Sequence, residues 1–334
     1  MSEPGTVLFI YQGHAERVAA VAWSPGGRHI ASGSWDKTVQ IWNLSSGQTI
    51  LTYRASTSPS RVNAVAWSPD GTHIASGNDD GSVHVWNTIS GSNVIIYRGH
   101  TSFVLSVAWS PDGRHIASGS WDSTVQIWDA LTGRHIGTYR GHPESVHAVA
   151  WSPDGTHIAS GGEDGTVQVW DSSSGKPTCI YHGHAARVNA VAWSPDGTCI
   201  ASGSRDETAQ VWHAATGQHI CIYRGHEWSV NALAWNPVMG TGYLSPREDS
   251  LPGGQGMPGG MYIASGSNDC TVQIWDATTR STIVTYHGHS GSLWNFVEAV
   301  AWSPDGRYIA SGSDNGTVHV WMSGGHLDAS TTAW

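Results

Sequence analysis

The residues in this sequence that could do chemistry are a histidine, a serine and an aspartate that occur together. His14, Ser32 and Asp36 form the first such set, and Trp42 follows closely. A serine nucleophile, a histidine base and an aspartate that orients the histidine are the parts of a hydrolase triad. The set therefore raises the hypothesis of an enzyme that attacks a carbonyl carbon.

The same set recurs along the chain, and this changes its interpretation. The further sets are His100, Ser118, Asp122 and Trp128; His142, Ser160, Asp164 and Trp170; His184, Ser202, Asp206 and Trp212; and His226, Ser265, Asp269 and Trp275. Buried polar groups must satisfy one another, and the loss of one partner costs ~1–3 kcal/mol. Because a structural unit needs the same internal contacts in every copy, the repetition favours a structural role over catalysis.

Two series of tryptophans define the repeating unit. The first series, in which each Trp follows an alanine, is Trp23, Trp67, Trp109, Trp151, Trp193, Trp235 and Trp302, with spacings of 44, 42, 42, 42, 42 and 67 residues. The second is Trp42, Trp86, Trp128, Trp170, Trp212, Trp275 and Trp321. A length of 334 residues would by itself indicate about two domains, at ~150 residues each. A seven-fold repeat replaces that estimate with one array.

Each period predicts four short antiparallel strands. The run before the first Trp is apolar and β-branched, as in a strand buried on both faces. Ser110-Pro111-Asp112-Gly113 is a typical tight turn, and a second strand, a turn and a third strand follow. Residues 129–133 form another turn and residues 134–139 the fourth strand. Four strands per ~42 residues without a helical period are typical of a propeller blade.

The Gly-His pairs, such as Gly99-His100, and the Trp-Asp pairs, such as Trp128-Asp129, resemble the signatures of WD repeats (WD-40). The resemblance covers residues 6 to 321, and the high identity between repeats resembles that of bacterial self-similar WD-repeat arrays. It implies an all-β, seven-bladed β-propeller. It also implies that the five His, Ser, Asp and Trp sets are structural tetrads, in which the Trp N–H, the Ser hydroxyl, the His and the Asp are linked inside each blade.

We expect residues 1–334 to form one propeller domain. The expected blades are 17–53, 61–97, 103–139, 145–181, 187–223, 229–286 with a Gly/Pro-rich insertion at 238–260, and 296–321. Residues 6–11 match the fourth strand of other repeats, whereas the last repeat stops after its third strand. The N-terminal strand is therefore expected to complete the last blade and close the ring, which removes exposed sheet edges.

Two repeats depart from the pattern. The second has Arg54-Ala55-Ser56-Thr57-Ser58 in place of Gly-His, which leaves Asp80 without its histidine. The seventh has Asn315 in the aspartate position opposite His289. We expect these two blades to be the weakest parts of the ring.

The composition excludes several classes of function. A net charge of −10 opposes binding to nucleic acid phosphates, and no apolar run approaches the ~20 residues of a membrane span. We expect no secretory signal, and the four cysteines, which lack C-x-x-C spacing, indicate reduced thiols in the cytoplasm. His29, His73, His115 and His157 occupy one repeat position and lie too far apart to share a metal ion. No cofactor or metal is expected.

Three positions per repeat vary freely and should open on one face of the ring. The residues expected to bind a partner there are Arg17, Trp35, Arg61, Asp79, Phe103, Trp121, Glu163, Arg187, Arg205, Trp294 and Phe296. Trp35 and Trp121 are expected to be exposed, because equivalent positions hold charged residues. Trp294 belongs to a small insertion at 290–296. An inner position is occupied by Ala19, Asn63, Leu105, His147, Asn189, Asn231 and Glu298.

The sequence therefore favours a non-catalytic scaffold, expected to be a monomer, that binds a protein or peptide on this face. Aromatic and arginine side chains are the types enriched at binding hot spots. Three alternatives stay open: a regulatory or sensor module of a larger signalling protein, an enzyme at the channel mouth that uses His147, Glu163 and Glu298, and a nucleic-acid-binding protein.

Overall fold

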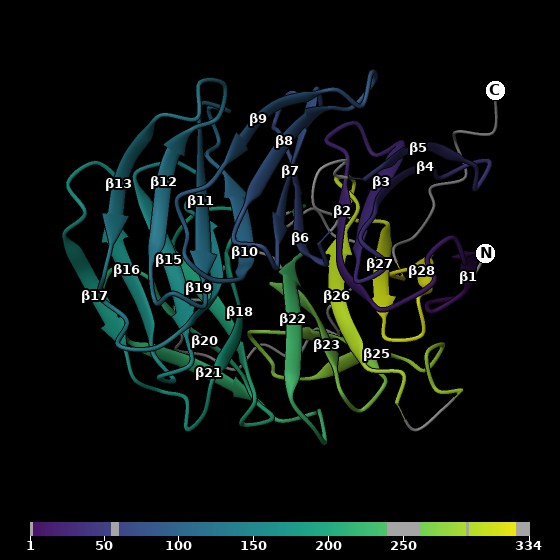
Figure 1. Cartoon of the computed structure of the whole chain (residues 1–334). Coiled ribbons are helices and arrows are strands. Elements are labelled where there is room, and N and C mark those ends of the chain that lie inside the picture. Colours follow the sequence, from purple (N-terminus) through teal and green to yellow (C-terminus); the bar gives the residue numbers. More distant parts are fainter. Residues whose placement is uncertain (1–2, 55–59, 239–260, 292–293, 325–334) are drawn as a thin grey trace.

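A computed structural model describes residues 3–54, 60–238, 261–291 and 294–324. Within these ranges all regular secondary structure is β, in seven four-stranded antiparallel sheets. The sheets stand around a central axis as the blades of a propeller (Figure 1). The predicted seven-bladed all-β fold is confirmed.

Each blade contributes one strand to each of four concentric positions. The innermost strands are β2 (Val18–Trp23), β6 (Val62–Trp67), β10 (Val104–Trp109), β14 (Val146–Trp151), β18 (Val188–Trp193), β22 (Val230–Trp235) and β26 (Val297–Trp302). The second strands are β3 (His29–Ser34), β7 (His73–Asn78), β11 (His115–Ser120), β15 (His157–Gly162), β19 (Cys199–Ser204), β23 (Tyr262–Ser267) and β27 (Tyr308–Ser313).

The outer half of each blade is built in the same way. The third strands are β4 (Val39–Asn43), β8 (Val83–Asn87), β12 (Val125–Asp129), β16 (Val167–Asp171), β20 (Ala209–His213), β24 (Val272–Asp276) and β28 (Val318–Met322). The outermost strands are β5 (Thr49–Tyr53), β9 (Asn93–Tyr97), β13 (His135–Tyr139), β17 (Pro177–Tyr181), β21 (His219–Tyr223), β25 (Thr282–Tyr286) and, for the last blade, β1 (Val7–Tyr11).

The hydrophobic core lies between neighbouring blades. Gly33 on β3 faces Val62 and Val65 on β6, and a methyl group added to Gly33 would lie 2.8 Å from each valine side chain. The absence of a side chain at this position therefore allows the blades to pack closely. On the other side of the same groove, Tyr53 stacks on Trp86 at a ring-centroid distance of 4.7 Å. Repetition of these contacts holds seven separate sheets in one ring.

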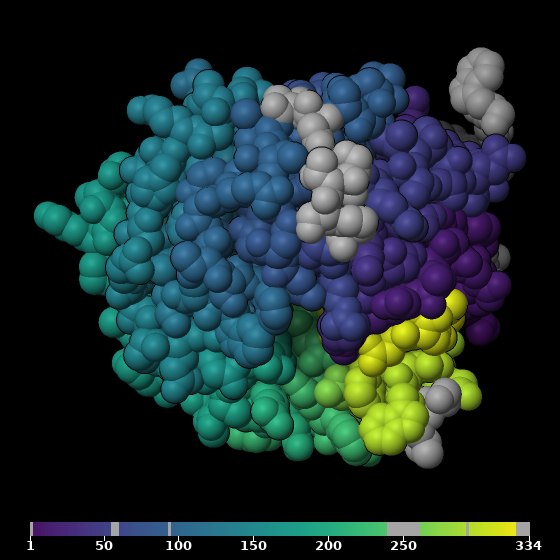
Figure 2. All heavy atoms as spheres, in the orientation of Figure 1, coloured from purple at the N-terminus to yellow at the C-terminus, as the bar shows by residue number. Residues whose placement is uncertain are grey.

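The N-terminal strand closes the ring. β1 pairs antiparallel with β28, so the fourth strand of the last blade comes from the other end of the chain. Figures 1 and 2 show the purple N-terminal residues beside the yellow C-terminal blade. Phe9 and Tyr11 on β1 also pack against Trp42 of the first blade. The predicted closure by the N-terminal strand is confirmed.

The connections between strands divide the surface into two faces. One face, called here the docking face, carries the connections from each outermost strand to the next innermost strand and from each second strand to the third. The opposite face carries the remaining turns. The predicted partner-binding positions lie in these two types of connection, from outermost to next innermost strand and from second to third strand, so they share the docking face. The predicted insertion stands between β22 and β23 in the sequence, and residues 239–260 lie outside the described residues.

Candidate functional site

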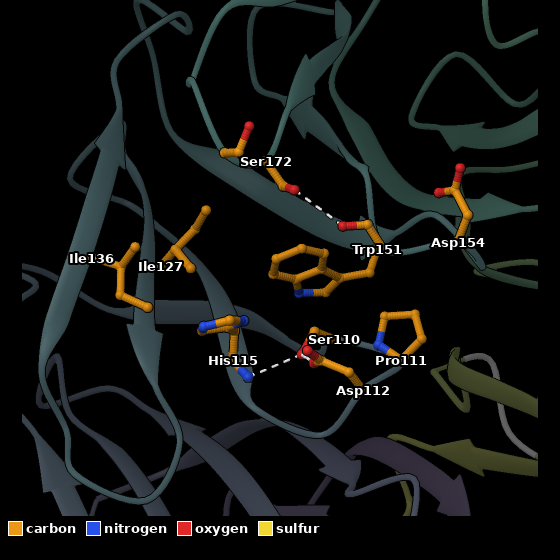
Figure 3. Close-up of a pocket in the computed structure, with 11 residues that line it drawn as sticks. Ser110, Pro111, Asp112, His115, Ile127, Ile136, Trp151, Asp154 and Ser172 are labelled. Carbon is orange, nitrogen blue, oxygen red and sulfur yellow. Dashed lines mark hydrogen bonds between the residues drawn. The ribbon is translucent and has the colours of Figure 1, made fainter.

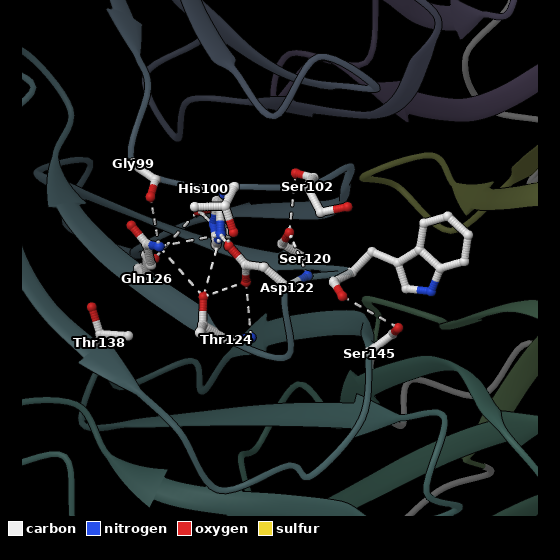
Figure 4. A network of polar contacts seen from close by, with 12 residues as sticks. Gly99, His100, Ser102, Ser120, Asp122, Thr124, Gln126, Thr138 and Ser145 are labelled. Carbon is white, nitrogen blue, oxygen red and sulfur yellow. Dashed lines mark hydrogen bonds and ion pairs between the residues drawn. The ribbon is translucent and has the colours of Figure 1, made fainter.

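The histidine, serine and aspartate sets form buried polar networks, as the third blade shows (Figure 4). His100 Nδ1 lies 2.9 Å from Asp122 Oδ2, and His100 Nε2 lies 2.8 Å from Ser118 Oγ. Thr124 donates its hydroxyl to Asp122, and Gln126 donates its amide to the Gly99 carbonyl. Since a carboxylate only accepts hydrogen bonds, the histidine Nδ1 carries the proton.

The same geometry recurs in five blades. The distance from the histidine Nδ1 to the aspartate Oδ2 is 2.7–2.9 Å, and that from the histidine Nε2 to the serine Oγ is 2.8–2.9 Å. Hydrogen bonds hold the pKa of Asp36, Asp122 and Asp206 well below its usual range, although burial alone would raise it. These carboxylates are therefore ionised at neutral pH.

The serine hydroxyls of these sets are out of reach of a substrate. Ser32, Ser118, Ser160, Ser202 and Ser265 are each 0% exposed. A nucleophile must approach a carbonyl carbon directly, and no substrate reaches these oxygens while the blades are folded. The arrangement has the composition of a hydrolase triad but the burial of a structural network.

The tryptophan link is uneven among the five sets. Trp128 and Trp275 donate their indole N–H to the serine hydroxyl at 3.4 and 3.2 Å. In Trp42, Trp170 and Trp212 the buried indole nitrogen has no hydrogen-bond partner among the described residues, so the expected fourth link is absent there. Stacking does not explain the difference, because Trp42, Trp170 and Trp212 stack on a tyrosine at 4.7–4.8 Å and Trp128 does so at 4.7 Å.

The two departing blades have incomplete networks. In the seventh, His289 Nε2 lies 2.8 Å from Ser311 Oγ, but its Nδ1 has no partner among the described residues, and its ring lies 4.0 Å from that of His319. Burial, reinforced by His319, lowers the pKa of His289 to about 3. In the second blade, residues 55–59 lie outside the described residues, and the buried Ser76 hydroxyl has no partner within the described part of the chain.

Sequence reasoning missed the outer members of these networks. Tyr97 donates its hydroxyl to Gln126 Oε1 at 2.6 Å, and the same contact joins Tyr139 to Gln168 and Tyr181 to Gln210. The signal was present, because a tyrosine ends each fourth strand and a glutamine sits in most third strands. In the second and seventh blades histidines replace this glutamine, and Tyr286 lies 2.8 Å from His319 Nδ1.

The docking face carries a first group of aromatic side chains on the third blade. Trp121 is 53% exposed and Phe103 is 37% exposed. Their rings stack with centroids 5.0 Å apart, and the Trp121 amide donates to the Phe103 carbonyl. Neither side chain belongs to the core, so the pair presents apolar surface to solvent.

A second aromatic group spans the sixth and seventh blades. Trp228 is 53% exposed and Trp294 is 67% exposed. Phe296 lies between them, with ring-centroid distances of 6.4 and 5.9 Å. Trp228 and Phe296 line a cavity of about 480 Å³ together with Asn268, Cys270 and other residues. Trp228 was not among the predicted residues, although it lies in the same connection as the predicted positions.

Trp35 is less accessible than expected. It is only partly exposed, because the Arg17 guanidinium lies over its ring at 4.5 Å and that of Arg61 at 4.4 Å. Its indole nitrogen is buried without a partner among the described residues. The indole ring is thus engaged in cation–π contacts within the protein, and of the two arginines Arg61 is exposed, whereas Arg17 is engaged in ion pairs.

The channel mouth is bordered by two ionic clusters. Arg17 forms ion pairs with both Glu298 and Asp314. His147 Nε2 and Arg187 Nη1 lie 2.8 and 3.6 Å from Glu163 Oε2. Burial raises the pKa of Glu298, and burial lowers the pKa of His147.

The inner positions converge on the channel itself. Ala19, Asn63, Leu105, His147, Asn189, Asn231 and Glu298 all line a central cavity of about 200 Å³. Asn63, Asn189 and Asn231 each donate to a backbone carbonyl of the next blade. The residues considered for acid–base chemistry belong to two different clusters, because Glu298 pairs with Arg17 whereas His147 pairs with Glu163.

The other predicted residues of the docking face have smaller roles in the geometry. Asp79 accepts a hydrogen bond from Asn63 at 2.8 Å, and Arg205 is exposed. Within the described ranges, no three His, Cys, Asp or Glu side chains gather in a way that could hold a metal ion. The same ranges contain no helix long and apolar enough to cross a membrane.

The fold defines the protein as a seven-bladed β-propeller, and five of its blades carry the same buried histidine, serine and aspartate network. The profile of the WD domain, G-beta repeat (WD40), matches residues 5–43, 47–87, 91–129, 133–171, 175–213, 257–276 and 280–322. These segments cover most of the chain, and the protein belongs to this family of WD40 repeats. Propellers of this family generally mediate protein interactions.

Several individual proteins are similar to this chain over short segments. The chain is 48% identical over 49 residues to ribosome biogenesis protein BOP1 homologs of Drosophila virilis and Drosophila grimshawi. It is 40% identical over 53 residues to the peroxisomal targeting signal 2 receptor of Homo sapiens. Each match spans 15% of this chain, and 6% or 16% of the relative's length. These matches therefore support the repeat family and not a particular activity.

Proposed function

We propose that this protein is a non-catalytic scaffold that binds a protein or peptide partner on its docking face. The observation that carries the proposal is the presence of two separate groups of exposed aromatic side chains on that face, Phe103 with Trp121 and Phe296 with Trp228 and Trp294. Large exposed aromatic side chains with polar neighbours are typical of interaction sites. The ring holds both groups in fixed positions, so little conformational entropy of these side chains is lost when a partner binds.

The charges of the docking face indicate how a partner would be oriented. Arg61 stacks on Trp35 and leaves the edge of its guanidinium for an acidic or carbonyl group, and Arg205 is exposed. Arg17 and Arg187 are engaged with carboxylates of the same face. An extended peptide with apolar anchors and an acidic residue fits this pattern.

Other aspects of the proposal rest on composition and on the sites just described. We propose a monomer without a nucleic acid partner, since the net charge is −10. A cytoplasmic location remains a prediction. A role as the binding module of a larger signalling protein uses the same docking face. The names of the matched relatives concern ribosome biogenesis and peroxisomal targeting, and the aligned segments are too short to assign either process.

Selection of binding peptides tests the proposal directly. A displayed library of random peptides is selected on the wild-type protein, and the affinities of the enriched peptides are then measured on purified variants. We expect Trp121→Ala or Trp228→Ala to weaken binding by tenfold or more, on the order of 1.4 kcal/mol. Leu131→Ala is the matched control, because Leu131 is 59% exposed on the opposite face.

The thermal unfolding midpoint of each variant shows that the fold is intact. Peptides whose affinity is unchanged by both tryptophan substitutions, or reduced equally by Leu131→Ala, contradict the assignment of the docking face. An affinity capture from lysate, followed by mass spectrometry of proteins lost in the Trp121→Ala, Trp228→Ala double variant, then identifies the natural partner.

A further inference from the structure

A second recess lies on the opposite face, between the third and fourth blades (Figure 3). It has a volume of about 520 Å³. Ile127 and Ile136 form one wall and the ring of Trp151 forms another, with His115 nearby. This volume is in the range of small-molecule sites, which are typically apolar with a few polar groups.

The recess exists because one blade lacks a side chain that the others have. The central residue of the outermost strand is Leu51, Ile95, Gly137, Cys179, Cys221, Val284 or Phe9. Gly137 pairs with Ile127 on the neighbouring strand, just as Leu51 pairs with Ile41 and Ile95 with Val85. In six grooves this residue packs into the apolar cluster between blades. The cluster between the third and fourth blades has no such member among the described residues.

The glycine of the next blade's outer turn confirms that the space is empty. A methyl group added at Gly133 would lie 3.1 Å from Ile95, and one added at Gly91 would lie 3.1 Å from Leu51. At Gly175, the equivalent position facing Gly137, it would meet no described atom within 4 Å. The same holds for Gly137 itself. The missing volume is therefore that of one aliphatic or aromatic side chain.

The rim of the recess is acidic. Asp112 and Asp154 line it, and neither lysine nor arginine is among the described lining residues. The hydrogen bond from Ser152 lowers the pKa of Asp154. Burial alone would raise the pKa of Asp112, but hydrogen bonds from Ser110 and the Arg114 amide outweigh it and lower that pKa. The recess thus joins an apolar interior to two carboxylates at its edge.

We propose that this recess is a binding site for a small molecule that combines an apolar group with a protonated amine. The apolar group takes the place that Leu51, Ile95 or Phe9 occupies in other grooves and lies against Ile127 and Trp151. The ammonium group lies toward Asp112 and Asp154, where a carboxylate and a cation attract one another. The site is distinct from the docking face and does not depend on the function proposed for it.

The proposal is tested with phenethylamine as the probe and its neutral isostere 2-phenylethanol as the comparison, both titrated calorimetrically. We expect millimolar or tighter binding of phenethylamine to the wild-type protein and several-fold weaker binding of the alcohol. Gly137→Leu, which restores the residue found in the first blade, should weaken phenethylamine binding by about tenfold or more. Gly137 lies in an ordinary strand conformation, so a leucine is compatible with the backbone there.

Two further variants separate the apolar from the charged contribution. Gly137→Ala adds a methyl group that meets no described atom within 4 Å, and it should keep most of the affinity. The Asp112→Asn, Asp154→Asn double variant should reduce phenethylamine binding to the level of the alcohol. Absence of phenethylamine binding at millimolar concentration, or equal affinity of the wild-type and Gly137→Leu proteins, overturns the site. Equal binding of the amine and the alcohol to the wild-type protein overturns the cationic class.

Discussion

Asn315→Asp is expected to stabilise the protein by completing the network of the seventh blade. In five other blades an aspartate oxygen lies 2.7–2.9 Å from the histidine Nδ1. In the seventh, Asn315 Oδ1 already accepts hydrogen bonds from the amide and hydroxyl of Thr317, as the equivalent aspartates do from their threonines. Asn315 is exposed and makes no hydrogen bond with His289, so the introduced carboxylate must turn toward His289 Nδ1, as the equivalent aspartates do, while it keeps the Thr317 contacts.

The magnitude follows from two opposing effects. A hydrogen bond to a charged group contributes ~1.5–3 kcal/mol, and His289, which is 1% exposed, now has an unpartnered nitrogen. Against this stands the desolvation of a carboxylate, which is limited because the equivalent aspartates keep 8–12% of their side-chain surface exposed. We expect a net gain of ~1–2 kcal/mol, which for a chain of this length corresponds to a rise of ~1–3 °C in the unfolding midpoint.

Thermal unfolding by circular dichroism at pH 7.5 measures this gain, with Asp122→Asn in the third blade as the inverse control. That control should lose ~1.5–3 kcal/mol, because it leaves the buried His100 without its acceptor. A midpoint that falls or stays constant in Asn315→Asp, while Asp122→Asn is destabilised, would refute the claim that the missing carboxylate weakens the seventh blade. No change in either variant would refute a stabilising role for the histidine–aspartate contact altogether.

Burial lowers the pKa of His289 to about 3 and that of His319 to about 4, so as the pH falls these histidines take up protons in the unfolded chain before they do so in the folded protein. Their contribution to the free energy of unfolding should be complete above pH 6.5 and fall by ~1.4 kcal/mol per pH unit for each histidine as the pH drops toward 4. Denaturant titrations at several pH values measure this loss. Removal of Val7–Tyr11 leaves β28 as an open edge, and size-exclusion chromatography should show self-association or aggregation. Trp128→Ala should cost ~3–5 kcal/mol because Trp128 is 0% exposed, whereas Trp121→Ala should change the unfolding free energy by less than ~0.5 kcal/mol.

The fold could be predicted from the sequence because each blade has the same strands, turns and packing contacts. The apolar, β-branched run before Trp23 and its equivalents, the Ser-Pro-Asp-Gly turns and the match of the N-terminal strand to other fourth strands are local signals. Blade number and ring closure follow from counting them. The seven sheets and the β1–β28 pairing confirm this reading.

The accessibility of individual side chains was harder to predict, because it depends on the neighbouring blade. Trp35 occupies a variable position and was expected to be exposed, yet Arg61 of the second blade covers one side of its ring. Trp228 is exposed in a connection whose neighbours are mostly small or polar, and no periodic pattern singled it out. The roles of 239–260 and of residues 292–293 concern parts of the chain outside the described residues and stay predictions.

Gly137 shows why a departure from the repeat carries information that the repeat itself does not. One glycine within a strand is ordinary in the sequence, since its consequence appears only in the groove toward the next blade, where a methyl group added at Gly137 or Gly175 meets no described atom within 4 Å and Trp151 lines the recess. Because the hydrogen bonds that pair the strands run within each sheet and apolar packing runs between sheets, a missing side chain leaves the strand pairing intact and opens only one groove. On the docking face the departure from the repeat is the reverse, because large exposed aromatic side chains stand at positions where other repeats have smaller or polar residues. A large partner suits projecting groups and a small ligand suits the recess, and the intervening blades, whose internal contacts are unchanged, give no reason for binding at one site to alter the other.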